Sequence, residues 1–180
     1  MKVEIPSDSI IACICEGGAE IAIIDTLLDN DLLVFKRSQL IDEVVIPRTS
    51  VKTFERRYLR LEYDQRIIVV RIIDSRSEAF KLSQAYRAQI EVINVITAPE
   101  IEMLIIVSQG KYADYCKSKI KKPSDYCKQV LKISSVKNPS FVREYFSDPQ
   151  FLIKSIKEYN RIHKQKNNEA SLFDIIRQKD

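Results

Sequence analysis

Two apolar runs constrain the fold of this chain more than any other feature. Residues 10–15 read IIACIC and residues 67–73 read IIVVRII, and neither run alternates between apolar and polar side chains. A strand with such a sequence is covered on both faces, which is typical of a parallel sheet with helices on either side. The two runs therefore predict an α/β fold built on a mainly parallel sheet.

Helical patterns separate the expected strands, and after Pro99 only helical patterns follow. We expect an α/β body at residues 1–108 and a basic helical extension at residues 109–180, packed on or beside that body. Besides the two runs, the expected extended segments are 32–35, 44–47 and 92–97. The expected helices are 18–29, 50–61, 78–88, 100–107, 113–118, 124–131, 141–146, 151–162 and a short capped helix at 172–176, which follows a polar linker at 164–169.

Each apolar run ends in a carboxylate. Glu16 follows the first run and Asp74 follows the second, so parallel strands would bring both to the same edge of the sheet. Open α/β sheets bind their ligands at the carboxyl ends of the strands, and two carboxylates there suit a divalent cation. The alternative is that each carboxylate caps the helix after it, which stabilises a helix by about 0.3–1 kcal/mol. Both interpretations stay open at the sequence level.

Charge is distributed unevenly along the chain. Residues 1–110 carry 13 Lys+Arg against 17 Asp+Glu, whereas residues 111–180 carry 16 against 8, giving balances of −4 and +8. A basic surface with interleaved tyrosines suits phosphates and bases, so nucleic acid is an expected partner, although a solvated lysine-rich face explains the same pattern. The candidate phosphate contacts are Lys117, Lys119, Lys121, Lys122 and Lys128, with Tyr112, Tyr115 and Tyr126 among them.

Several functional classes are disfavoured by composition. The four cysteines lack the paired spacing of a zinc site or a disulfide framework, and His163 is the sole histidine. Gly17-Gly18 lacks the Gly-Lys-Ser/Thr ending of a phosphate-binding P-loop. No run is long enough to span a bilayer and the first residues do not resemble a secretion signal, so we expect no membrane partner and a cytoplasmic address.

The layout of these motifs resembles the Toprim-like domains of topoisomerases, primases, and OLD-family and RloB-like defence proteins. Those domains begin with a strand ending in Glu-Gly, as at Glu16-Gly17, and carry Asp-x-Asp after a later strand, where this chain has Asp74-Ser75-Arg76. Residues 97–107 (TAPEIEMLIIV) are similar to the region of RloB-like members where a glutamate opens an apolar helix, which makes Glu100 its counterpart. The resemblance covers roughly residues 10–107.

The resemblance implies a metal-dependent nuclease or related phosphoryl-transfer protein, in phage defence or mobile-element biology. Mg²⁺ or Mn²⁺ would be held by Glu16, Asp74 and Glu100, with Glu20 as a further candidate, and Glu16 would also serve in acid–base chemistry. Arg76 replaces the second aspartate: its charge opposes metal binding, or it clamps the scissile phosphate.

A structural role suits two of these carboxylates as well as a catalytic one. Glu20 and Glu100 each lie where a helix begins, so helix capping accounts for them equally well. The principal alternative function is a non-catalytic Toprim-like module that binds nucleic acid or a protein. A nucleotide-binding regulatory domain is less favoured. A partner protein or self-association is left open.

Overall fold

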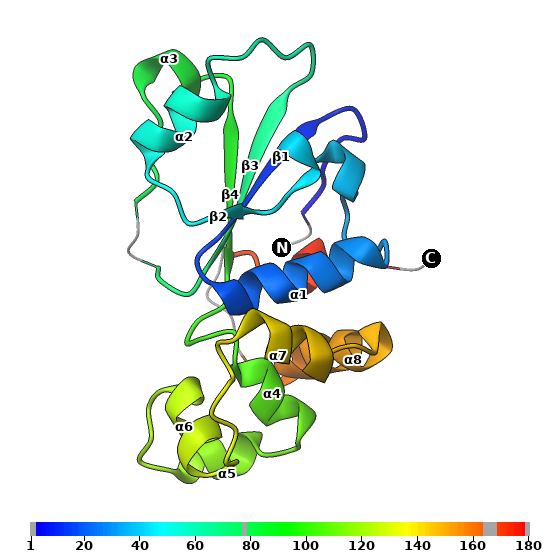
Figure 1. The fold of residues 1–180 in the computed structure, drawn as a ribbon, viewed down its shortest axis with the longest axis vertical. Helices are drawn as coiled ribbons and strands as arrows, with labels where there is room; N and C mark the ends of the chain where they lie inside the picture. Colours follow the sequence, from blue (N-terminus) through cyan, green and yellow to red (C-terminus); the bar gives the residue numbers. More distant parts are fainter. Residues whose placement is uncertain (1–2, 77–78, 164–168, 179–180) are drawn as a thin grey trace.

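The computed structural model describes residues 3–76, 79–163 and 169–178 and contains a four-stranded parallel sheet with helices on both faces (Figure 1). The predicted α/β fold class is therefore confirmed. The strand order is β2-β1-β3-β4. The strands are β1 (Ile10–Cys15), β2 (Ile46–Pro47), β3 (Ile67–Ile73) and β4 (Glu91–Ile96).

The register of the sheet brings the carboxyl ends of its three longer strands to one edge. Cys15 pairs with Ile72, and Ile73 pairs with Ile96. The ladder continues past the strand ends, because Glu16 N–H donates to the Ile72 carbonyl at 3.1 Å and Thr97 N–H donates to the Ile73 carbonyl at 2.8 Å. The residues that directly follow β1, β3 and β4 are therefore neighbours.

One face of the sheet carries the larger hydrophobic core. Ile11, Val70 and Val95 point into it, and all three are fully buried. Figure 1 shows α1 along this side of the sheet, with α7 and α8 beyond it. The helices that contribute buried side chains are α1 (Gly18–Asp29), α4 (Met103–Ser108), α6 (Pro123–Gln129), α7 (Pro139–Tyr145) and α8 (Pro149–Ile162). Buried residues from both sides of residue 108 thus form one cluster.

A smaller core covers the opposite face. It joins Val69 to Phe54 of α2 (Val51–Tyr58) and to Leu82. Arg71, the one charged residue within the apolar run of β3, is only 3% exposed on this side. Its guanidinium lies over the Phe80 ring, 4.7 Å from the centroid, and donates to Asn94 Oδ1 at 3.2 Å. The charge is therefore buried with an aromatic face and an amide as partners.

Most predicted elements form, with three corrections. The predicted helix at 78–88 is reduced to α3 (Gln84–Arg87), with residues 77 and 78 outside the described residues. The predicted strand at 32–35 does not form, because this segment packs against the carboxyl terminus and makes an isolated bridge from Leu33 to Ile176. The extended segment predicted at 44–47 is shortened to β2, and of the predicted linker at 164–169 only Glu169 lies within the described residues.

The carboxyl-terminal segment docks along the sheet. Ala170 bridges to Val95 of β4 in parallel, and the Ile96 N–H donates to the Ala170 carbonyl at 2.8 Å. The 3-10 helix η3 (Leu172–Ile175) begins with the capping box predicted from Ser171 and Asp174. The segment around Ala170 therefore lies beside the end of β4, although more than 70 residues separate the two in sequence.

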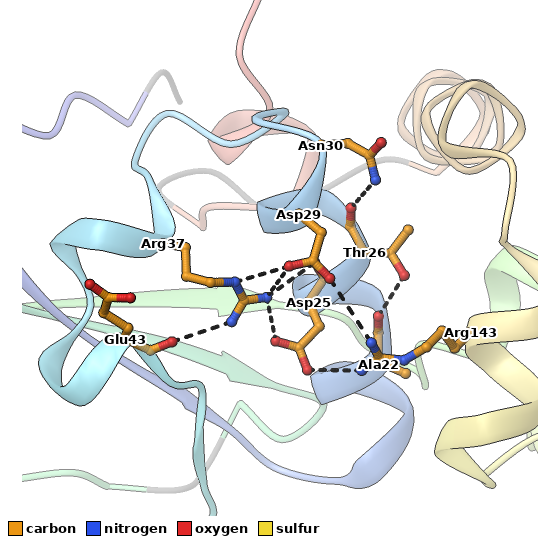
Figure 2. A network of polar contacts seen from close by, with 8 residues as sticks. All are labelled: Ala22, Asp25, Thr26, Asp29, Asn30, Arg37, Glu43 and Arg143. Carbon is orange, nitrogen blue, oxygen red and sulfur yellow. Dashed lines mark hydrogen bonds and ion pairs between the residues drawn. The ribbon is translucent and has the colours of Figure 1, made fainter.

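A polar network fixes the outer face of α1 (Figure 2). Arg37 donates to Asp25 Oδ1 at 2.8 Å and to Asp29 Oδ1 at 2.7 Å, and Arg143 of α7 donates to Asp25 Oδ2 at 3.1 Å. Burial lowers the pKa of Arg37, but the two aspartates outweigh that effect and raise it. This network joins α1 both to the segment after it and to α7.

Among the described residues, no helix combines the length and the apolar character needed to cross a membrane. The remaining short helices are η1 (Arg37–Gln39), η2 (Ile41–Glu43) and α5 (Tyr112–Lys117).

Close packing at the start of α1 explains Gly18. A Cβ atom at this position would lie 2.6 Å from Pro139 Cγ at the start of α7. We expect Gly18→Ala to destabilise the protein by about 1–3 kcal/mol, the usual cost of overpacking. Urea denaturation would measure the change. Pro139→Ala in the same chain should recover most of the loss, and a neutral or stabilising Gly18→Ala, as helix propensity alone would give, would contradict this packing.

Candidate functional site

The two strand-end carboxylates meet as the sequence predicts. Glu16 Oε2 accepts a hydrogen bond from the backbone N–H of Asp74 at 3.0 Å, which locks the end of β1 to the end of β3. Glu16 Oε1 accepts from Arg48, which follows β2, at 3.0 Å. Glu16 is therefore held by groups from both strands that flank β1. Its carboxylate lies at the edge where parallel sheets bind ligands.

Asp74 holds its proton more tightly than an ordinary aspartate. Burial raises the pKa of Asp74 from 3.8 to about 6, and a hydrogen bond with Glu16 and the charges of Glu16 and Glu100 add to the effect, while Lys137 opposes it. The charges of nearby carboxylates disfavour the ionised form of Asp74 because like charges at short range repel. Near neutral pH the Asp74 carboxyl group is therefore able to take up or release a proton.

Glu20 lies behind this pair, in the first turn of α1, and is only 7% exposed. Burial raises the pKa of Glu20, and the charges of Asp74 and Glu16 raise it further, although a hydrogen bond to its own backbone N–H lowers it. Gly17 makes room for it, since a Cβ atom there would lie 2.8 Å from Glu20 Oε2. The glycine after Glu16 is thus explained by the neighbouring carboxylate.

Glu100 belongs to the same edge but has its own partners. Its Oε2 accepts from the Ser124 backbone N–H at the start of α6 at 2.8 Å, and its Oε1 pairs with Lys137 at 3.2 Å. Burial alone would raise the pKa of Glu100, but these bonds outweigh burial and lower it. Glu100 is therefore an ionised carboxylate that also anchors the basic extension beside the site.

Two residues of this cluster were missed by sequence reasoning, Glu102 and Lys137. Glu102 is 5% exposed, and burial raises its pKa to about 7, with further raising by Glu100 and Glu20. Burial lowers the pKa of Lys137, but Glu102 and Glu100 outweigh it and raise that pKa. The only sequence signal for Glu102 was its place between apolar residues, whereas Lys137 lies in a loop that no motif marks.

The cluster of five carboxylates now comprises Glu16, Glu20, Asp74, Glu100 and Glu102. Among the described residues, no three Asp, Glu, His or Cys side chains are arranged as a ready metal-binding group. The helix-start interpretation remains for Glu20, in the first turn of α1, whereas Glu102, the residue before α4, makes no capping hydrogen bond with its side chain. Helix capping does not describe Glu16, whose carboxylate accepts from the Asp74 backbone N–H across two strands.

Arg76 does not contact this pair through any hydrogen bond of the described residues. Its Nε donates to Glu169 Oε1 at 2.8 Å, in an ion pair in which the side chains are 36% and 20% exposed. The guanidinium also lines a cavity next to Glu100. Arg76 is thus at the margin of the site, paired with the segment that precedes Ala170.

The candidate phosphate-binding lysines are exposed, in and around α5 and α6. Figure 1 places these two helices beyond the carboxyl ends of the strands. The tyrosines are used differently from the prediction. Tyr126 is 2% exposed and Tyr115 packs edge-on against it at 5.3 Å, so the Tyr126 ring is closed to a stacking base.

The four cysteines are free thiols, with Cys116 exposed and the other three buried.

Comparison with known proteins adds no identity: no family model, no curated protein and no solved structure matches this chain.

The pKa of Glu100 is lowered and that of Glu102 is raised, so the two residues serve as a matched pair of test positions. The raised pKa of Glu102 means that the folded state binds its proton more strongly than the unfolded state, so the parent protein loses stability as pH rises from about 4.5 to about 7. Glu102→Gln removes this loss. Relative to the parent it should gain on the order of 2 kcal/mol across that window, measured by urea denaturation.

Glu100→Gln should behave in the opposite way. Its lowered pKa gives stability that is present above about 4.5 and is lost as pH falls, so the substitution costs most at neutral pH. A loss of about 1–3 kcal/mol is expected at pH 7 and a smaller one at pH 4. Parallel pH dependences for the two variants would show that this arrangement of charges is wrong.

Proposed function

We propose that this chain is a Toprim-like, metal-dependent phosphodiesterase that acts on nucleic acid. The observation that carries the proposal is the meeting of Glu16 and Asp74 at the carboxyl edge of the sheet, across a hydrogen bond of 3.0 Å. In that bond the Asp74 backbone N–H donates to Glu16 Oε2, which brings the two residues together at the edge where both carboxylates could bind one cation. The sequence resemblance supplies the reaction class.

The donor set suits Mg²⁺ or Mn²⁺. Both are hard cations that prefer carboxylate oxygens, and Mg²⁺ keeps several water ligands, so Glu16 and Asp74 suffice as its protein ligands. Burial is the main cause of the raised pKa of Asp74, about 6, and the charges of Glu16 and Glu100 add to it; a bound cation would offset the contribution of those charges. Glu20 and Glu100 act on this pair through charge, since the charge of Glu100 raises the pKa of Asp74 and the charges of Asp74 and Glu16 raise the pKa of Glu20. A bound cation would supply charge stabilisation to the reacting phosphate.

The chain's own residues divide the remaining work. Asp74 would hold the cation in its ionised form, and Glu16 would exchange a proton with the attacking water or the leaving oxygen, the acid–base role that the resemblance implies. Arg48 and the Asp74 N–H orient Glu16. Arg76 binds the scissile phosphate after leaving Glu169, because a guanidinium matches two phosphate oxygens at once.

The exposed lysines account for substrate attraction. The α6 N-terminus is bonded to Glu100, so the basic helices are continuous with the carboxylate cluster. A nucleic acid strand bound along these lysines would pass the site at the edge of the sheet. RNA and DNA both satisfy this arrangement.

A second candidate is a non-catalytic module that binds nucleic acid or a protein. It is favoured by the cations already paired with the cluster, since Arg48 neutralises Glu16 and Lys137 neutralises Glu100. In that interpretation the carboxylates and basic residues form a structural network. The two candidates separate on metal binding and turnover.

Manganese calorimetry with Asp74→Asn tests the enzyme proposal. The parent should bind Mn²⁺ with a dissociation constant near or below roughly 1 mM, and the variant should lose this binding because one of two ligands is neutral. Cleavage of labelled single- and double-stranded DNA and RNA should fall at least about 100-fold, while affinity for nucleic acid is kept. Asp8→Asn, an exposed change before β1, is the control. A parent that binds no Mn²⁺ and cleaves nothing would leave only the binding module.

Salt dependence tests the lysine surface. Changing Lys117, Lys119, Lys121 and Lys122 to Gln should weaken nucleic-acid binding and lower the slope of log affinity against log salt by about 0.7–0.9 per phosphate contact removed. Fluorescence anisotropy at several salt concentrations would measure both. The control carries the same loss of charge elsewhere, at Lys52, Lys81, Lys154 and Lys157, which are exposed. Equal effects of the two sets of substitutions would show that these lysines attract nucleic acid only through the net charge of the protein.

A further inference from the structure

A second basic surface lies on α2, in the half of the chain whose overall charge is negative. Residues 48–60 carry five Lys+Arg against one Glu, a balance of +4, whereas residues 1–110 as a whole have a balance of −4. Four of the five basic residues recur at intervals of four: Arg48, Lys52, Arg56 and Arg60. Residues four apart lie on one face of a helix, so Lys52 and Arg56 share a face of α2.

The basic side chains of this face surround a hollow in the surface. Lys52, Arg56 and Arg60 line a hollow of about 320 Å³, and Tyr86 of α3 lines it as well. All three basic residues are exposed. A water molecule takes up roughly 30 Å³ in the liquid, so this volume corresponds to about ten waters and admits a phosphate group with part of its sugar.

The cations around this hollow lack counter-charges. Among residues 3–76, 79–163 and 169–178, the side chains of Lys52, Arg56 and Arg60 form no ion pair. One acidic residue in the described part of the chain lines the hollow, Glu55, and its Oε1 accepts a hydrogen bond from the Ser83 backbone N–H at 2.6 Å. Three like charges beside one carboxylate leave a positive potential, which a bound anion would reduce.

Phosphate is the anion that suits these side chains best. A guanidinium presents a planar fork of donors that matches two phosphate oxygens at once, and here two such groups line the same hollow. A nucleic-acid strand offers a phosphate at every nucleotide, and half to two-thirds of protein–DNA hydrogen bonds go to the phosphates and sugars. Arg56 and Arg60 are therefore arranged as contacts to phosphate groups.

The basic face begins at the carboxylate cluster. Arg48, the first residue of the series, donates to Glu16 Oε1 at 3.0 Å. Phe54 of α2 packs in the smaller core and Tyr126 of α6 packs in the larger core, so these two helices cover opposite faces of the sheet. Along the long axis of the molecule, the carboxyl ends of the strands lie between α2 and the α5–α6 pair (Figure 1). The candidate site is thus flanked by a basic surface on each side.

We propose that the hollow lined by Arg56 and Arg60 binds phosphate groups of a nucleic-acid strand, which the α5–α6 lysines contact on the other side of the site. The choice of nucleic acid as the source of the phosphates rests on the proposed function. A free phosphorylated compound presents the same phosphate groups to the hollow. The experiments below separate these two sources.

Salt dependence of binding tests the two arginines. The double variant Arg56→Gln, Arg60→Gln should weaken binding of a labelled single-stranded DNA of 30 nucleotides and lower the slope of log affinity against log salt by about 1.4, at about 0.7 per phosphate contact. Fluorescence anisotropy of the full chain at several salt concentrations would measure both. Lys52 stays unchanged, which keeps this test separate from the lysine substitutions above.

The charge-matched control is Lys154→Gln with Lys157→Gln, on the exposed face of α8. It removes the same charge and should leave the slope close to that of the parent. Equal losses in the two double variants would overturn the proposal. Since all four residues are exposed, both variants should melt at the temperature of the parent.

A conservative variant separates contact from structural damage. Arg56→Lys with Arg60→Lys keeps both charges and removes the planar fork, so it should restore most of the salt slope, because that slope counts neutralised phosphates. A slope that stays as low as with glutamine would show that the substitutions act through altered structure, and would overturn the proposed contacts.

Inorganic pyrophosphate identifies the source of the phosphates. Calorimetric binding of pyrophosphate to the parent, lost in the Arg56→Gln, Arg60→Gln variant, would show that the hollow accepts a free phosphorylated compound. Binding of the 30-nucleotide strand that depends on the two arginines, without binding of pyrophosphate, would show that the phosphates belong to a strand. If neither probe depends on the two arginines, the proposal is wrong.

Failure of this inference is distinguishable from failure of the proposed function. If the hollow does not bind phosphates, manganese binding and cleavage that depend on Asp74 persist, and the variants of Arg56 and Arg60 bind DNA like the parent. If the chain is not a metal-dependent enzyme, manganese binding is absent, while DNA binding that depends on the two arginines persists and supports the binding module.

Discussion

Negative charge concentrated at one edge of a parallel sheet is the constraint on which the rest of this structure depends. The register places the ends of β1 and β3 side by side, and the Asp74 N–H holds the Glu16 carboxylate against the backbone at the end of β3. Two unit charges about 4 Å apart repel by about 1–4 kcal/mol, depending on how much water surrounds them. A fold that keeps such groups together must offset that repulsion, and this fold does so in two ways.

In the first way, a carboxylate is paired with cations and N–H groups. In the second way, a carboxyl group keeps its proton. Glu16 and Glu100 take the first, through Arg48 and through Lys137 with the Ser124 N–H. Asp74 and Glu102 take the second, since burial, with a smaller contribution from neighbouring carboxylates, raises their pKa values to about 6 and about 7. The division separates carboxylates with cation and N–H partners from carboxyl groups able to exchange a proton near neutral pH. Separation of pKa values in this way is typical of sites that carry out acid–base chemistry, and structural charge networks also produce it.

The sequence could predict those parts of the site that depend on local pattern. The runs at 10–15 and 67–73 and the Glu-Gly step fix β1, β3 and the start of α1, because each follows from neighbouring residues. Lys137 was not predictable, since it reaches Glu100 across 37 residues of chain. The helix at 78–88 failed because packing of this segment against α2, with Phe80 and Leu82 in the smaller core, overrode its helical pattern. Tyr126 was misread because its ring fills the larger core.

The same dependence on distant residues bears on Arg76. In the sequence, Arg76 is a positive charge within an acidic motif. In the structure it forms an ion pair with Glu169, which belongs to the segment that pairs with the edge of β4. An ion pair with this exposure contributes about 0–1 kcal/mol, and in the proposed function a phosphate that offers two oxygens would compete with the single carboxylate for the guanidinium. The pairing with Glu169 holds Arg76 away from Glu16 and Asp74, so in that proposal the guanidinium would not oppose a cation at the strand ends.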